Sequence, residues 1–109
     1  MLTGEGLVVV DVDLYHEGAE DAVEALYDLG VALKQQDDFV AAEAALRAAL
    51  RIDATLPETP FTLGVVLWQT GRADEAIPLF QEALKRRPDY ADAHYMLGTV
   101  LKQQGALDE

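Results

Sequence analysis

Residues 57–90 read PETPFTLGVVLWQTGRADEAIPLFQEALKRRPDY, and this stretch recurs, with changes, on both of its sides. Aligned without gaps, residues 23–56 and 57–90 are identical at 9 of 34 positions. A Leu-Gly pair recurs every 34 positions, at Leu29-Gly30, Leu63-Gly64 and Leu97-Gly98. Recurrence at a fixed period of this length indicates a repeat architecture, so we expect an array of repeated units.

The period divides the 109 residues into four segments. Residues 23–56 and 57–90 are two full repeats, and residues 91–109 are a partial third. Residues 1–22 form an N-terminal acidic segment with six acidic residues and no Lys or Arg. This segment has two open interpretations, a degraded helix that precedes the first repeat or a strand with alternating apolar residues.

Each full repeat is predicted to form two helices, because apolar residues return every three or four positions. The predicted first helices span 22–36, 58–70 and 91–104, and the second helices span 39–52 and 73–87. Gly71 and Gly105 mark the turns that follow first helices, and Asp37 occupies the same place in the first repeat. Glycines inside the first helices suggest close helix contact, with Ala42 and Ala76 expected as the facing residues.

The pattern resembles the tetratricopeptide repeat, W-x2-L-G-x2-Y…A-x3-F…P over 34 residues. Residues 57–90 give Pro60-x2-Leu63-Gly64-x2-Leu67, then Ala76-x3-Phe80 and Pro88. The sequence departs from this pattern at the Trp and Tyr positions, and Ala54 stands where proline is expected. The resemblance covers residues 23–109. It implies an all-α fold, a right-handed α-solenoid of helix-turn-helix repeats.

The same resemblance implies a non-enzymatic module for protein–protein interaction. In this family the first helices line a concave face that binds peptides or protein segments, and a row of acidic residues edges it here: Glu24, Glu58 and Asp92. We therefore expect a peptide or protein segment that is apolar with some basic character. The candidate groove residues repeat at the same spacing: Tyr27, Val31, Lys34, Phe61, Val65, Trp68, Tyr95, Thr99 and Lys102.

Two alternatives to a binding groove remain, one for the aromatic row and one for the whole chain. The aromatic row of Tyr27, Phe61 and Tyr95 could instead pack between neighbouring first helices. His94 is expected to pack in a core position of its helix. The whole chain could also be a structural or oligomerising fragment of a larger repeat protein, and a homo-oligomer that associates through its uncapped ends.

Composition excludes several other classes. Eight basic and 20 acidic residues give a net charge of −12, which disfavours nucleic-acid binding and docking to an anionic membrane. The chain has no Cys, Ser or Asn, so a serine triad and thiolate metal sites are excluded. We expect no catalytic residues, no metal site and no cofactor. No targeting segment is visible, and a cytoplasmic location is expected.

Overall fold

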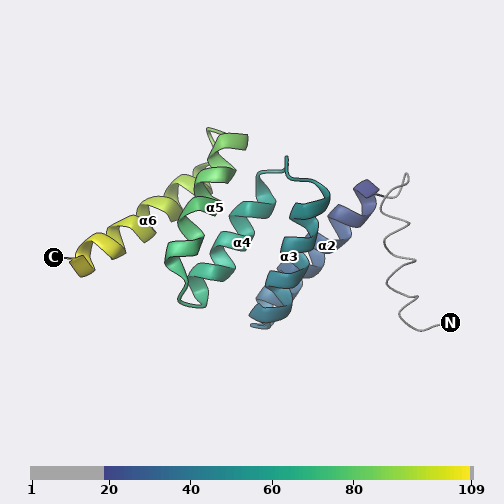
Figure 1. Cartoon of the computed structure of the whole chain (residues 1–109), viewed down its shortest axis with the longest axis horizontal. Helices are drawn as coiled ribbons and strands as arrows, with labels where there is room; N and C mark the ends of the chain where they lie inside the picture. The colour runs from purple at the N-terminus through teal and green to yellow at the C-terminus, as the bar shows by residue number, and fades with distance from the viewer. Residues whose placement is uncertain (1–18, 109) are drawn as a thin grey trace.

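The computed structural model describes residues 19–108, with side chains described for residues 21–105. This part of the chain forms five α-helices and no strand, which confirms the all-α prediction. The helices are α2 (Ala19–Gln35), α3 (Phe39–Ile52), α4 (Glu58–Gln69), α5 (Ala73–Arg86) and α6 (Ala91–Asp108) (Figure 1). The two interpretations of the N-terminal segment fall mainly on residues 1–18, outside the described residues.

The helices stack in chain order, with α2 and α6 at opposite ends of the array (Figure 1). Helices α2 and α3 pack as one hairpin, and α4 and α5 pack as the next. Each second helix also contacts the following first helix, as α3 does with α4 and α5 with α6. First helices meet only over short stretches, between α2 and α4 and between α4 and α6. The result is a tetratricopeptide-type solenoid.

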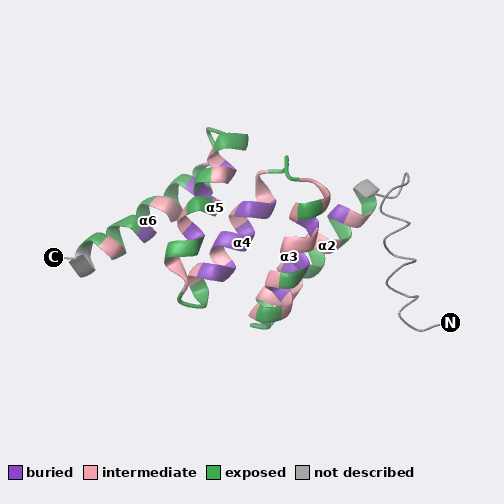
Figure 2. Ribbon diagram, in the orientation of Figure 1, coloured by how far each residue is buried: buried purple, intermediate pink, exposed green. Residues whose placement is uncertain are grey.

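The spacing of small and apolar residues explains this packing. On α3 the buried residues fall three or four positions apart on one face, at Ala42, Ala45, Leu46 and Ala49. Helix α4 is covered on more of its surface, because it lies between the two second helices (Figure 2). More than half of its residues are buried: Thr59, Pro60, Thr62, Leu63, Gly64, Val66 and Leu67.

The two turns within the hairpins have the same construction. Asp37 has a φ of 64° and Gly71 a φ of 82°, the left-handed region in which glycine is unstrained. In both repeats, the backbone amide of the residue after this position donates a hydrogen bond to a carbonyl in the last turn of the first helix. Asp38 N donates to Leu33 O at 2.9 Å, and Arg72 N donates to Leu67 O at 2.8 Å. These bonds satisfy carbonyl groups at the end of each first helix.

The mid-helix glycines of α2 and α4 permit close approach, but not chiefly to the expected alanines. A Cβ on Gly30 would lie 2.6 Å from Leu46 Cγ, and one on Gly64 would lie 2.7 Å from Phe80 Cε1. The facing residue is therefore the large apolar side chain four positions after each alanine. Ala42 contributes only its carbonyl oxygen, 3.5 Å from the Gly30 position. The small residue makes room for a bulky neighbour.

Helix α6 differs from the two preceding first helices. The predicted turn at Gly105 is wrong, because α6 continues to Asp108. The prediction that His94 packs in a core is also wrong, since its side chain is exposed and its Nε2 lies 2.7 Å from Pro88 O. No described helix packs on this face of α6, and a Cβ on Gly98 would meet nothing within 4 Å. Without such a neighbour, tertiary packing favours neither the turn nor burial of His94.

Candidate functional site

The nine predicted groove residues lie on the partly exposed side of the first helices. None is fully buried. Tyr95 and Lys102 are exposed, and the others are half-buried: Tyr27, Val31, Lys34, Phe61, Val65, Trp68 and Thr99. Intermediate exposure lets a side chain support its neighbours and still present surface to a ligand. The positions thus fit the lining of a groove.

Two residues of the aromatic row take part in packing, Tyr27 between repeats and Phe61 within its own repeat. Tyr27 on α2 is hydrogen-bonded through its hydroxyl to Thr62 Oγ1 on α4, at 2.9 Å. Phe61 lies between Phe80 and Tyr90, with ring centroids 5.9 Å and 5.1 Å away. Tyr95 follows in the same row and is 72% exposed. Two members of the row therefore have a structural role, and the third presents a ring to solvent.

Trp68 joins the second and third first helices. Its indole Nε1 donates to Gln103 Oε1 on α6, at 3.1 Å, while its ring packs against the apolar core. Lysines occupy the same position in the neighbouring repeats, half-buried at Lys34 and exposed at Lys102. The indole keeps part of its surface accessible, since Trp68 is half-buried.

The acidic residues along the edge differ in whether they form an ion pair with a basic residue. Glu58 accepts a hydrogen bond from Arg87 Nη2 at 2.6 Å, and this bond raises the pKa of the Arg87 guanidinium above its ordinary value. The same guanidinium lies 4.8 Å above the centre of the Tyr90 ring. Burial raises the pKa of Tyr90 to about 12, so its phenol is neutral near pH 7. Among the described residues, no base forms an ion pair with Glu24 or Asp92.

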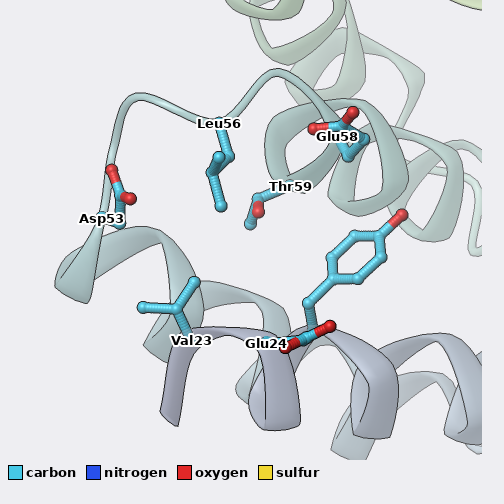
Figure 3. A pocket seen from close by; sticks show the side chains of 7 residues that line it. Val23, Glu24, Asp53, Leu56, Glu58 and Thr59 are labelled. Carbon is cyan, nitrogen blue, oxygen red and sulfur yellow. The ribbon is translucent and has the colours of Figure 1, made fainter. Parts of the chain in front are cut away.

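A pocket lies where α2, the α3–α4 loop and the start of α4 meet (Figure 3). Its volume is about 420 Å³. Figure 3 shows Leu56 and Thr59 pointing from the loop and α4 toward Val23 on α2. Three carboxylates add negative charge to this apolar lining. The lining residues are Val23, Glu24, Tyr27, Asp53, Leu56, Glu58 and Thr59.

Two polar groups in this pocket differ in how they are satisfied. Asp53 Oδ1 accepts hydrogen bonds from Thr55 Oγ1 at 2.5 Å and Thr55 N at 2.9 Å. These bonds hold the pKa of Asp53 below its usual value, so the carboxylate is charged at neutral pH. Thr59 Oγ1 is buried and has no hydrogen-bond partner among the described residues. A buried hydroxyl without a partner costs free energy, and a bound polar group would remove that cost.

Only part of this pocket could be predicted from the sequence. Tyr27 was a groove candidate, and Glu24 and Glu58 belonged to the acidic row. Four other residues were missed, because none forms a row across the repeats: Val23, Asp53, Leu56 and Thr59. A signal was nevertheless present at the 34-residue spacing, where Asp53 and Leu56 correspond to Arg87 and Tyr90. Differences between repeats, rather than shared residues, mark the pocket.

The side chains of the pocket and of the first helices are suited to contact a ligand. Among the side chains of residues 21–105, no three His, Asp or Glu gather as a candidate metal site. No helix in this range is long and apolar enough to cross a membrane. The apolar walls and the three carboxylates of the pocket can hold a partly apolar cation. The half-buried first-helix residues can contact an extended segment.

Several solved structures resemble this chain. The crystal structure of MamA is 28% identical, with a TM-score of 0.75, over 79% of this chain and 50% of MamA. An O-GlcNAc transferase mutant from Thermobaculum terrenum is 34% identical, with a TM-score of 0.72, over 76% of this chain and 16% of the transferase. The chain thus spans about half the length of the MamA structure. No curated protein sequence matches it.

Sequence comparison identifies the family directly. The family model described as tetratricopeptide repeat matches residues 12–57 and residues 61–109, which together are most of the chain. Such repeats are generally non-catalytic scaffolds that bind proteins or peptides. The repeated hairpins, the glycine contacts and the structural similarity agree with this match. The chain belongs to the tetratricopeptide repeat family.

Proposed function

We propose that this chain is a protein-interaction module that binds an extended, largely apolar protein segment along its first helices. One observation carries the proposal: all nine candidate positions keep some exposure, on three helices that follow one another in the array. Tyr95 and the accessible part of Trp68 would be the aromatic anchors. Large aromatic side chains commonly supply binding energy, because they bury much area at low entropy cost.

Charge favours a segment with basic character. The net charge of the chain is −12, and the acidic edge contains Glu24 and Asp92, neither of which forms an ion pair with the described residues. A basic segment would be attracted to this edge, while its apolar side chains contact Val31, Val65 and Thr99. Complementary charge of this kind raises the association rate more than the final affinity.

The proposal is tested with a random twelve-residue peptide library selected against the immobilised chain. Tyr95→Ala should weaken the selected peptides about tenfold or more without unfolding the protein, because this side chain is 72% exposed. Val40→Ala is the matched control, since Val40 is 84% exposed on the second helix α3. Equal loss of binding in both variants, or peptides that bind all variants equally, would contradict the assigned face.

A further inference from the structure

Two equivalent junctions join the repeats, one between α2, the α3–α4 loop and α4, and one between α4, the α5–α6 loop and α6. They have the same helical framework but different side chains. In the second, Arg87 donates to Glu58, stacks on Tyr90, and Tyr90 packs on Phe61. Moving back 34 positions gives the residues of the first junction, which line the pocket. Tyr27 takes the place of Phe61, and Glu24 takes the place of Glu58. Asp53 stands where the second junction has Arg87, and Leu56 stands where it has Tyr90.

The replacements remove a cation and reduce volume. Glu58 faces a guanidinium, whereas its counterpart Glu24 shares the pocket with Asp53, another carboxylate. Leucine in place of tyrosine leaves an aromatic ring's space unfilled. The first junction therefore has unbalanced negative charge beside an apolar space. Like charges in one site are unfavourable unless a cation lies between them.

Thr59 supplies an independent observation. Its counterpart in the second junction is Ala93, which is buried and has no polar side chain. Thr59 is also fully buried, and its hydroxyl has no partner among the described residues. Figure 3 shows this side chain directed toward the pocket, near Leu56. The pocket wall thus contains a buried hydroxyl without a partner among the described residues, at a position that the second junction leaves apolar.

We infer that the pocket between α2 and α4 accepts an arginine side chain from the partner segment, which supplies the guanidinium that Arg87 supplies in the next junction. The inference rests on the proposed function and names a subsite within it. The alkyl part of the side chain would contact Val23 and Leu56. The guanidinium would donate to Glu24 and to Thr59 Oγ1, with the ring of Tyr27 beside it.

Charge balance favours a ligand from outside the described helices. Of the three carboxylates in the pocket, only Glu58 forms an ion pair with a base among the described residues, Arg87, and Asp53 has the charge of Arg86 nearby without an ion pair. Residues 1–22 contain no Lys or Arg that could reach back to the pocket. An arginine fits better than a lysine, because its planar guanidinium can donate to a carboxylate and a hydroxyl at once.

The test uses N-acetyl-arginine amide as the probe and its uncharged isostere, N-acetyl-citrulline amide, as the control. Each is titrated into the full chain while amide and methyl NMR signals are followed. The arginine probe should shift the signals of Val23, Leu56 and Thr59 at millimolar concentration, and the citrulline probe should bind at least about tenfold more weakly. Equal binding of both probes, or no shift at these residues, would overturn the inference.

Two variants make the test specific. Glu24→Gln should weaken the arginine probe about tenfold while the protein stays folded, since Glu24 is exposed. The double substitution Asp53→Arg with Leu56→Tyr copies the second junction, so it should abolish probe binding and raise the melting temperature. If the double variant does not fold, Glu24→Gln decides alone. Unchanged probe affinity in Glu24→Gln would refute the subsite.

Two further outcomes distinguish the arginine subsite from the proposed function as a whole and from self-association of the chain. Library peptides that require Tyr95 but bind Glu24→Gln as tightly as wild type would refute the arginine subsite and leave the proposed function standing. A second copy of the chain is the other possible source of the arginine. Sedimentation at millimolar concentration should show a monomer with and without the probe. A dimer that the probe dissociates would contradict a separate partner.

Discussion

The guanidinium of Arg72 lies 2.8 Å from the carboxylate of Glu43, so the start of α5 is tied to the second helix of the preceding repeat. Arg72 also pairs with Glu75 at 2.8 Å, and Glu43 pairs with Arg47 at 2.9 Å. This network links α3 to α5, two helices that have few other contacts with each other. The hydrogen bond from Arg72 holds the pKa of Glu43 below its ordinary value.

That lowered pKa predicts a pH dependence. A carboxyl group with a depressed pKa in the folded state stabilises the fold above its unfolded pKa, and loses this effect as pH falls through the folded pKa. We expect Glu43→Gln to melt at a lower temperature than wild type at pH 7. The difference should begin to shrink as pH falls below the unfolded value of about 4.3, and vanish only once pH has passed below the lowered folded pKa. Thermal melts from pH 7 to pH 3 check this; a constant difference would contradict it.

The glycine contacts predict opposite effects for one substitution at equivalent positions. Gly64→Ala should lower the free energy of unfolding by about 1–3 kcal/mol, because the new methyl group would overlap the buried Phe80 ring. Gly98→Ala is the matched control. It should raise the free energy of unfolding by up to about 1 kcal/mol, since alanine favours a helix and meets no neighbour within 4 Å. Urea denaturation measures both. Destabilisation by both would refute the packing.

The turn between α2 and α3 contains a strained residue beside a stabilising one. Asp37→Gly should stabilise the fold by about 1 kcal/mol, because φ is 64° there and glycine adopts this region freely. Asp38→Ala should destabilise it by a similar amount, about 1 kcal/mol, since the Asp38 carboxylate accepts from Ala41 N at 3.3 Å and caps α3. Calorimetry of the two single variants should give melting temperatures on opposite sides of wild type.

Pro78 interrupts the hydrogen bonding of α5. It is the sixth residue of this helix, beyond the first turn that tolerates proline, and its side chain is exposed. Pro78→Ala should therefore raise the free energy of unfolding by about 1–3 kcal/mol. Loss of the proline removes no buried contact. A melting temperature equal to or below that of wild type would show that the ring has a packing role.

The sequence predicts the repeated framework well, for a physical reason. Residues that recur at 34 positions meet the same neighbours in each repeat, so Gly30 and Gly64 both meet the large side chain of a second helix. The bounds of α3 match the prediction, from Phe39 to Ile52. The turns at Asp37 and Gly71 were also predicted, because glycine adopts positive φ without strain and Asp37 holds the same place in the first repeat.

What the repeat pattern missed depends on neighbours that differ between repeats. Leu29 and Leu63 are equivalent in sequence, yet Leu63 is buried and Leu29 is 49% exposed. Helix α4 has neighbours on both sides, whereas α2 and α6 stand at the ends of the described array. Periodicity therefore predicted His94 and Gly105 wrongly. The pocket was missed because it arises from Asp53 and Leu56, which break the pattern.

The central claim is that the first helices bind a protein segment. The most direct measurement is NMR mapping of a library-selected peptide on the labelled chain. Large amide shifts are predicted on α2, α4 and α6, around Val31, Val65 and Thr99, with little change around Val40 on α3. Shifts centred on the outer face of α3 and α5, or the absence of any peptide that binds, would contradict the account.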